Sequence, residues 1–115
     1  MVAASCSGPN GRAGLKLMLD TGATTSVISR KALVSIGYDP DASPDRVTVA
    51  TGGGIQSVPR VVLNRLSALG VHRLAFPVLG HTLPEGVEID GLLGLDFLRG
   101  TELTLDFRLG RIDLR

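Results

Sequence analysis

A single carboxylate at the end of an apolar run is the first candidate for chemistry in this chain. Leu17-Met18-Leu19 leads directly into Asp20-Thr21-Gly22, so a predicted strand delivers an acid into a turn. The turn adds a hydroxyl at Thr21, and Gly22 allows another stretch of backbone to approach closely. A carboxylate at the end of a buried strand costs free energy unless it is hydrogen-bonded, neutralised or used in a reaction. Asp20 is therefore either a reacting acid or the side chain of an ordinary Asx-turn, and the triplet alone fits both.

A second motif lies about 70 residues further along the chain. The stretch Gly91-Leu92-Leu93-Gly94-Leu95-Asp96 is apolar up to its last residue, which predicts a buried strand that runs into a short helix. Between the two motifs, Thr51-Gly52-Gly53-Gly54 separates two β-rich runs and predicts a hairpin with a glycine tip. An acid-bearing turn, a glycine-tipped hairpin and a Gly-apolar-apolar-Gly stretch thus follow one another in this order.

These three features, in this order and spacing, resemble the retropepsins, the single-lobe aspartic proteases of retroviral type. The resemblance covers residues 14–107, and Gly94 to Leu98 is similar to the Gly-x-Asp-Phe-Leu motif of the bacterial and cellular members. It implies an all-β fold, a closed β-barrel with one or two short helices and one lobe per chain. Residues 1–115 are expected to form one such domain, with the activity of an aspartic-type endopeptidase.

The resemblance assigns the catalytic role to Asp20, supported by Thr21 and Gly22. Metal-free acid–base hydrolysis of a peptide needs two neighbouring carboxyl groups, and two such groups about 3 Å apart hold one proton between them. The chain has only one Asp-Thr-Gly, so the second acid must be Asp20 of another copy across a two-fold axis. A homodimer acting on a peptide or protein substrate is therefore expected. By the same resemblance, the Thr21 hydroxyls hold the opposite loop and Gly22 binds substrate backbone.

The hairpin of residues 47–58 corresponds to the flap that covers the substrate in this family. A peptide would lie extended beneath it, recognised through backbone pairing and through pockets for alternate side chains. We expect apolar side chains beside the scissile bond, because the expected lining is apolar. The expected substrate contacts are Ala23, Val49, Ala50, Thr51, Gly52, Gly53, Gly54, Ile55 and Leu92. An ordinary mobile hairpin is the alternative, whereas a phosphate-binding loop is disfavoured because no Lys-Ser/Thr and no helix follow the glycines.

Two positions near these motifs depart from the viral pattern. Viral members often carry Arg where this chain has Leu95, paired with an Asp where this chain has Thr24, so that ion pair is absent here. Dimer contacts are then expected from the alternating apolar edges of Val2–Cys6 and Thr101–Arg115. Asp96 is expected to hydrogen-bond backbone near the start of the short helix rather than to act as the second catalytic acid.

Turn signals at short intervals divide the chain into strands, as in an all-β domain. Gly8-Pro9-Asn10-Gly11 predicts a hairpin turn whose Asn-Gly pair supplies the positive φ angles. Ser29 is expected to cap a short helix that Gly37 ends. The other predicted strands are Val2–Cys6, Gly14–Leu19, Thr24–Ile28, Val47–Ala50, Ile55–Leu63, Leu66–Val71, Leu74–Leu79, Thr101–Phe107 and Arg111–Leu114.

The composition argues against several other classes of protein. Of 115 residues, 43% are apolar and 20% are charged, which is the balance of one folded domain rather than of a disordered chain. A net charge of +1 gives no field that attracts nucleic acid or an anionic membrane, so neither is an expected partner. Cys6, the only cysteine, excludes an internal disulfide and fits a reducing, cytoplasmic location slightly better. His72 and His81 lack metal-ligand spacing, and no metal or other cofactor is expected.

Two other functions fit the same residues. A domain of this fold can serve as a dimeric binding or scaffold module with little or no proteolysis, because fold does not fix function. A plain structural β-domain, with Asp20 in an Asx-turn, is the other alternative. Replacement of Asp20 by Asn separates the enzyme from the module. Binding of a statine-type transition-state analogue excludes the plain domain, since its hydroxyl must sit between two carboxyls.

Overall fold

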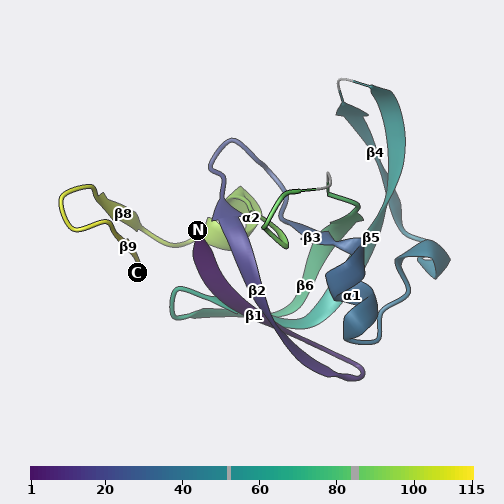
Figure 1. Cartoon of the computed structure of the whole chain (residues 1–115), viewed down its shortest axis with the longest axis horizontal. Coiled ribbons are helices and arrows are strands. Elements are labelled where there is room, and N and C mark those ends of the chain that lie inside the picture. The colour runs from purple at the N-terminus through teal and green to yellow at the C-terminus, as the bar shows by residue number, and fades with distance from the viewer. Residues whose placement is uncertain (52, 84–85) are drawn as a thin grey trace.

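The computed structural model of the chain describes residues 1–51, 53–83 and 86–115. Strands predominate, with short helical segments inserted after β3 and β7 (Figure 1). The elements are β1 (Val2–Gly8), β2 (Gly11–Leu19), β3 (Val27–Ser29), α1 (Arg30–Ser35), the 3-10 turn η1 (Pro40–Ala42), β4 (Arg46–Thr51), β5 (Gly54–Ala68), β6 (Val71–His81), β7 (Gly91–Leu93), α2 (Leu95–Leu98), β8 (Leu103–Asp106) and β9 (Arg111–Leu114).

The barrel closes through a ring of paired strands. Its strands follow one another in the order β1-β2-β7-β3-β6-β5, and β5 pairs back with β1 through Ala4↔Ala68. β4 lies beyond β5 in the same sheet and pairs with it from Arg46↔Pro59 to Thr51↔Gly54. The β4–β5 hairpin therefore projects from the barrel (Figure 1). The closed, single-lobe β-barrel expected from the sequence is confirmed.

Alternation of side chains along the strands fills this barrel. On β2, Leu15 and Leu17 are buried while Lys16 and Met18 face outward. Other fully buried side chains are Ile28, Leu33, Leu63, Leu66, Val78, Leu93 and Phe97. Because Leu33 belongs to α1 and Phe97 to α2, both helices are anchored in the same core as the strands.

The first hairpin and the first helix form where they were predicted. β1 and β2 pair from Val2↔Leu17 to Gly8↔Gly11. Of the Asn-Gly pair in their turn, only Gly11 has a positive φ, at 134°. The Ser29 hydroxyl accepts a hydrogen bond from the Ala32 N–H at 3.2 Å and so caps α1, as expected of a serine at this position.

Two predicted strands are wrong in their limits. A strand was predicted over Thr24–Ile28, but β3 begins only at Val27. Residues 20–26 form a loop whose end is hydrogen-bonded to Asp96. The predicted strand Leu66–Val71 does not exist as a separate element, since β5 runs on to Ala68 and a turn at Leu69 and Gly70 leads into β6. Both turn residues have positive φ, 53° and 80°. The sequence did not indicate this turn, because a residue such as Leu69 rarely adopts a positive backbone φ.

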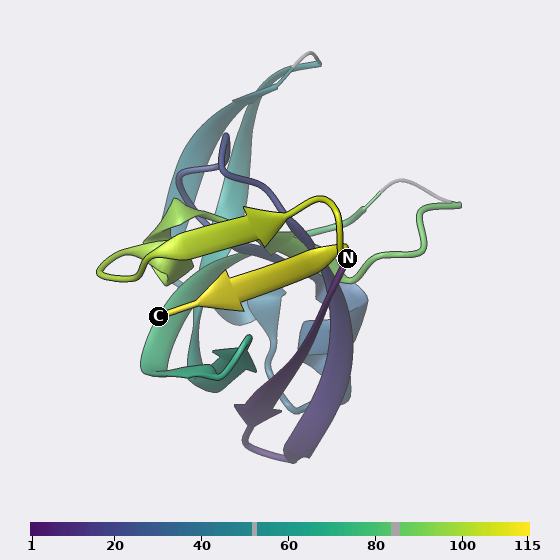
Figure 2. The same cartoon turned by 90° about the vertical axis from the view of Figure 1, so that its left-hand side faces the viewer.

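The chain ends in a hairpin that is separate from the barrel sheet. β8 and β9 pair from Leu103↔Leu114 to Asp106↔Arg111 as a two-stranded sheet of their own. Figures 1 and 2 show this hairpin projecting from the side of the barrel on which the N-terminus also lies. Among the described residues, no helix has the length and apolar character that crossing a membrane requires.

Candidate active site

Asp20 lies where β2 ends, and backbone groups fix it from two directions. β2 runs parallel to β7 with Leu19 opposite Leu93, and the Asp20 N–H donates to the Leu93 carbonyl at 3.0 Å. The Gly22 N–H donates to Asp20 Oδ1 at 3.0 Å, and the Ala23 N–H donates to the Asp20 carbonyl at 3.1 Å. In the described part of the chain, no hydrogen bond engages Oδ2 of Asp20. The half-buried side chain is therefore held in place with one carboxylate oxygen available to a ligand.

The loop presents its polar groups at the surface. Thr21 and Gly22 are exposed, and Ala23 is half-buried. A Cβ added at Gly22 would lie 3.2 Å from Asp20 Oδ1, so a larger residue would crowd the bonded carboxylate. The bond from Gly22 to Asp20 also has the pattern of an Asx-turn, which both interpretations of the sequence predict. Thr21 is therefore open to solvent, and the half-buried Asp20 lies outside the hydrophobic core cluster.

Two glycines let α2 and β7 pack directly beneath this loop. A Cβ at Gly91 would lie 1.9 Å from the Val27 carbonyl oxygen, so no side chain fits there. A Cβ at Gly94 would lie 2.9 Å from the Ala23 carbonyl oxygen. The next residue, Leu95, donates its N–H to that same Ala23 carbonyl at 2.8 Å. The Gly-apolar-apolar-Gly stretch thus makes close backbone contact with the Asp20 loop, and we call residues 20–26 and 91–98 together the floor.

Asp96 is committed to a structural role within the floor. Its carboxylate accepts hydrogen bonds from the Ser26 N–H at 3.0 Å, the Ser26 hydroxyl at 2.7 Å and the Phe97 N–H at 2.8 Å. The Ser26 hydroxyl, which is fully buried, also accepts a bond from the Gly94 N–H at 2.9 Å. Sequence reasoning placed Asp96 correctly but missed Ser26, because no local pattern joins residues that are 70 positions apart.

The same segment is recognised at the family level. A family model described as Aspartyl protease matches residues 6–97, which include the Asp20 loop and most of the floor. The chain belongs to the aspartyl protease family. Family and fold together support a protease function in general.

Solved aspartic proteases share the fold of this aspartyl protease. A retropepsin-like aspartic protease from Rickettsia conorii superposes with a TM-score of 0.65 at 19% identity, covering 97% of this chain and 76% of that chain. The EIAV protease complexed with the inhibitor HBY-793 superposes with a TM-score of 0.60 at 22% identity, covering 91% of this chain and 90% of that chain. No curated protein matches the sequence significantly. These likenesses show the retropepsin-like fold that the sequence motifs predict.

The predicted substrate contacts divide between the floor and the flap. Ala23 belongs to the floor loop, and Leu92 of β7 lies opposite both Met18 of β2 and Val27 of β3. The flap contacts lie on the projecting β4–β5 hairpin, well apart from the Asp20 loop in this single chain (Figure 1). Gly52, also predicted to contact substrate, lies outside the described residues.

The strand register separates the predicted flap contacts by face. Ala50 and Ile55 are cross-strand partners, so they share one face of the flap, and both are exposed. Val49 is opposite Gln56 and lies on the other face, where it is half-buried. A bound peptide can therefore meet Ala50 and Ile55 together, but not these two and Val49 on the same surface. At the tip, the backbone of Thr51 pairs with Gly54, and Gly53 is exposed.

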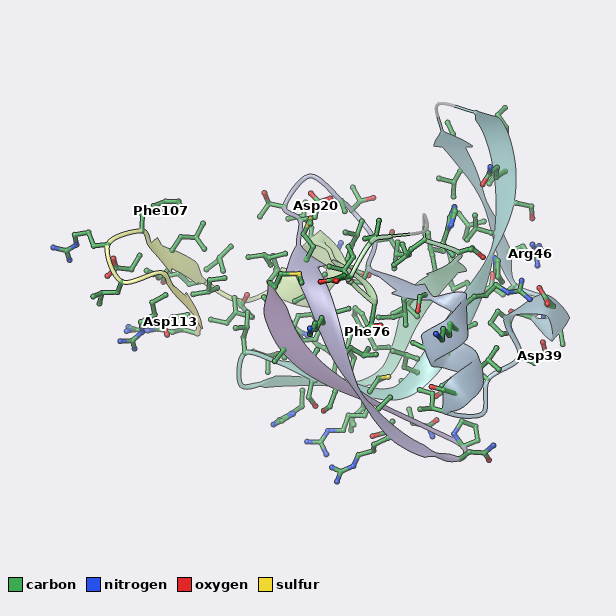
Figure 3. All side chains as sticks on the ribbon, in the orientation of Figure 1. Asp20, Asp39, Arg46, Phe76, Phe107 and Asp113 are labelled. Atoms are coloured by element: carbon green, nitrogen blue, oxygen red, sulfur yellow. The ribbon has the colours of Figure 1, made fainter. Side chains whose placement is uncertain are left out.

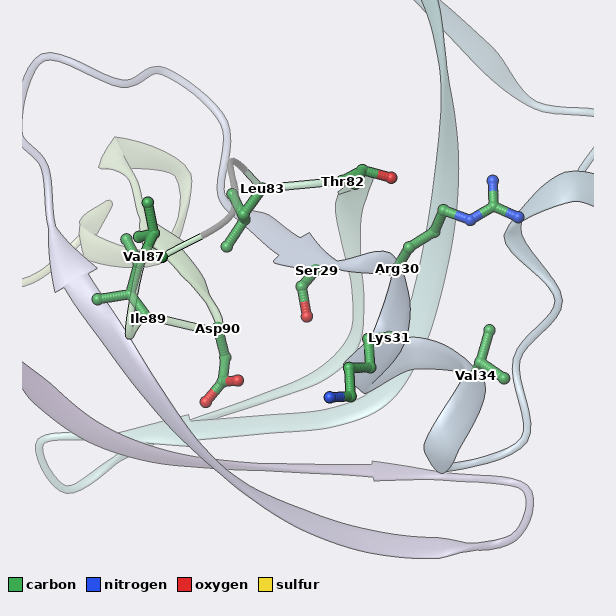
Figure 4. A pocket seen from close by; sticks show the side chains of 10 residues that line it. Ser29, Arg30, Lys31, Val34, Thr82, Leu83, Val87, Ile89 and Asp90 are labelled. Atoms are coloured by element: carbon green, nitrogen blue, oxygen red, sulfur yellow. The ribbon is translucent and has the colours of Figure 1, made fainter.

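A pocket of about 780 Å³ lies elsewhere, between α1 and the segment that precedes β7 (Figure 4). Its lining residues are Ser29, Arg30, Lys31, Val34, Thr82, Leu83, Gly86, Val87, Ile89 and Asp90. None of these is a predicted catalytic or substrate-binding residue. Asp90 accepts a hydrogen bond from the Lys16 N–H at 2.8 Å, so this carboxylate serves to hold β2 beside β7.

The remaining reactive side chains have structural surroundings. Burial raises the pKa of the Cys6 thiol, which keeps it protonated at neutral pH and unreactive as a nucleophile. His72 Nδ1 lies 2.7 Å from the Ser67 hydroxyl, and His81 Nδ1 lies 2.7 Å from the Thr82 carbonyl. The described ranges contain no cluster of three or more His, Cys, Asp or Glu that could hold a metal ion.

Proposed function

We propose that the protein is an aspartic endopeptidase that works as a homodimer, with a water molecule activated between the Asp20 carboxyls of two chains. The bonding of the acids supports this proposal most directly. Asp20 has one carboxylate oxygen that no described group engages, whereas both oxygens of Asp96 accept hydrogen bonds from its own chain. The sequence offers no second Asp-Thr-Gly. The partner acid is therefore best supplied by a second copy.

Two such carboxyls hold one proton at rest, because two negative charges about 3 Å apart repel strongly. The ionised carboxylate takes a proton from the water molecule while the water oxygen attacks the scissile carbonyl carbon. The protonated carboxyl donates its proton to the carbonyl oxygen, which gives a tetrahedral diol. As the C–N bond breaks, one carboxyl protonates the leaving nitrogen and the other recovers the proton of a diol hydroxyl. The products are an amine and a carboxylic acid, and the pair returns to its singly protonated state.

The side of the barrel that bears the terminal hairpin carries unpartnered apolar side chains suited to a dimer contact. Phe107 and Leu109, on the hairpin between β8 and β9, are 91% and 70% exposed. Met1 beside β1 is also exposed, as is Leu95 in the floor. Figure 3 shows Phe107 at the far end of this hairpin. The hairpin leaves the barrel on the side nearer to Asp20 and away from Asp39. Burial of these residues against a second copy would bring the two Asp20 loops toward one axis.

The substrate is proposed to be an extended peptide held between floor and flap. Asp20, Thr21 and Gly22 provide the chemistry, and Ala23 and Leu92 line the floor. Ala50 and Ile55 contact the peptide from the flap, with the backbone of Thr51, Gly53 and Gly54 above the scissile bond. The cleft is completed only by two chains, so the half-cleft of one chain lies open to solvent. Apolar side chains are expected on both sides of the scissile bond.

The decisive test compares Asp20→Asn with Asp39→Asn. Asp39 is an exposed acid on the opposite side of the barrel (Figure 3), so its replacement removes the same charge without touching the floor. Each protein is incubated with a proteome-derived peptide library at acid and neutral pH, and its mass is measured by sedimentation. We expect D20N to remain dimeric and to lose at least about a thousandfold in cleavage rate, whereas D39N cleaves as the wild type does.

Two results would overturn this assignment. Cleavage that persists in D20N would remove Asp20 from the chemistry. A wild-type dimer that binds peptides of the library without cutting them would identify the dimeric binding module instead.

A further inference from the structure

The terminal hairpin is joined to the barrel through a short and closely bonded exit from α2. Gly100 has a φ of 80°, and both the N–H and the hydroxyl of Thr101 donate to the Leu98 carbonyl, at 3.0 and 2.5 Å. At the start of the hairpin, Glu102 and Arg115 exchange two backbone bonds at 2.9 and 3.1 Å. The backbone that leads out of α2 thus has a defined direction before β8 begins.

A side chain from a distant strand holds this exit. Arg73 of β6 donates from Nε and Nη2 to the Phe97 carbonyl at 3.2 and 2.8 Å. The same Nη2 donates to the Arg99 carbonyl at 2.7 Å. These carbonyls belong to the last turn of α2 and to the residue that follows it, where a helix leaves its backbone oxygens without partners. One guanidinium therefore binds both sides of the point where the chain leaves the barrel.

The guanidinium also lies over the aromatic ring of Phe97. Its carbon lies 5.6 Å from the centre of the Phe97 ring, close enough for a cation–π contact. Phe97 is fully buried and packs edge-to-face on Phe76 of β6, with ring centres 5.7 Å apart at 88°. In the part of the chain that the structure describes, no carboxylate pairs with Arg73. Among the described residues, the hydrogen bonds of its side chain go to the Phe97 and Arg99 carbonyls.

We infer that Arg73 is a positioning residue for homodimer assembly, because it fixes the direction in which the terminal hairpin leaves the barrel. This inference rests on the proposed function, in which a second copy packs against that hairpin. The described core contacts of the hairpin come from Leu103, Ile112 and Leu114, and its most exposed side chains are near its tip. A small change of angle at the exit displaces that tip by the largest amount. Arg73 acts on the dimer through the hairpin and does not touch the proposed reacting atoms.

The chemistry of the contact requires arginine. A guanidinium presents several N–H groups in one rigid plane, so it can bridge two carbonyls and lie over a ring at the same time. A lysine ammonium keeps the charge but is a compact point donor on a flexible stem. A methionine keeps much of the apolar stem and donates nothing. Arg73→Lys and Arg73→Met therefore form a graded series at this position.

The test measures specific peptidase activity against protein concentration, together with the dimer dissociation constant from sedimentation. Arg65→Met is the matched control, since Arg65 lies on the neighbouring strand β5 and the described hydrogen bonds of its side chain go to Ser67 and His72, away from the exit. We expect R73M to raise the dimer dissociation constant about 10- to 100-fold, the effect of losing hydrogen bonds from a charged group. We expect R73K to have a smaller effect and R65M to have none. At saturating protein concentration, R73M should recover the turnover number of the wild type.

A merely structural role for Arg73 gives a different result. In that case R73M and R73K lose the same fraction of activity at every protein concentration, or the dimer constant of R73K and R73M equals that of the wild type, and the inference is wrong. If R73M does not fold, R73K carries the same comparison, because it retains the charge and the stem. A wild-type protein that cleaves as a monomer would instead contradict the proposed function itself, which keeps the two failures distinct.

Discussion

The floor and the flap are built on opposite principles. In the floor, the buried Ser26 hydroxyl is bonded on both sides, and at Gly91 the backbone of another strand comes too close for any side chain. In the flap, Ala50 and Ile55 face outward from a two-stranded ladder, and a Cβ at Gly54 would meet nothing within 4 Å. The polar groups of the floor are therefore bonded to one another, whereas the flap exposes its side chains to solvent.

This difference indicates which parts of the site exist before a partner or substrate arrives. The floor holds Asp20 through bonds made within a single chain, so its geometry does not depend on assembly. The flap depends on the ladder and on contacts at its base, where Arg46 donates to the Ser57 hydroxyl at 2.8 Å and to the Ser57 carbonyl at 3.0 Å. Substitutions in the floor should therefore change stability, and substitutions on the exposed face of the flap should change substrate binding.

The largest effect is expected for Gly91→Ala. The added Cβ would lie 1.9 Å from the Val27 carbonyl oxygen and 2.9 Å from its carbon, so β3 and β7 would have to separate. We expect a loss of about 3 kcal/mol or more in the free energy of unfolding, measured by urea denaturation. Gly14→Ala on β2 is the matched control, because its Cβ would meet nothing within 4 Å. A G91A protein as stable as G14A would show that the floor can open at little cost.

A smaller loss is expected when the polar lock of the floor is broken. Asp96→Ala leaves the Ser26 N–H and hydroxyl without their acceptor, which should cost about 2–3 kcal/mol in the free energy of unfolding. Asp96→Asn keeps one acceptor oxygen and should lose about 1 kcal/mol. The double variant S26A/D96A should lose little more than either single variant, since both act on one network. Strictly additive losses would mean that Ser26 and Asp96 act independently.

The sequence predicted the parts of the floor that depend on residue type and local order. The turn that contains Asp20 and Gly22 could be predicted from residue types that are adjacent in the sequence. The same holds for Gly91 to Leu98, a strand that leads into a helix. The bond between Ser26 and Asp96 has no such signature, because a buried serine and an acid far along the chain become neighbours only when the barrel closes. For the same reason the sequence did not distinguish Arg73 from the other basic residues, because its contact with the Phe97 carbonyl forms only in the folded chain.

The barrel itself was predictable only through a family resemblance. Alternation along β1 and β2 gives strands and a hairpin, but the pairing of β1 with β5 joins segments that no local pattern relates. The predicted limits of β5 were wrong because Asn64 and Arg65 are both exposed, which breaks the alternation of buried and exposed side chains within one continuous strand. Ala75 on β6, with a φ of 47°, marks the same irregularity on the neighbouring strand.

The smallest effect on stability, with a clear effect on activity, is expected for Ile55→Ser in the flap. The Ile55 side chain is 78% exposed, so its loss should change the free energy of unfolding by less than about 0.5 kcal/mol. If Ile55 packs on a bound peptide, the lost apolar contact should lower kcat/KM about tenfold, chiefly through KM. Val62→Ser is the control on the same strand, since Val62 is 52% exposed and lies outside residues 47–58.

A second flap variant sharpens this prediction by face. Val49 lies on the side of the flap opposite to Ala50 and Ile55, so Val49→Ser should leave KM unchanged while lowering stability slightly through its half-buried side chain. Steady-state kinetics on one cleaved peptide, with unfolding measured on the same samples, separates the two quantities. A raised KM in V49S together with a normal KM in I55S would show that the other face of the flap meets the substrate, since the register does not allow both faces to touch one extended peptide.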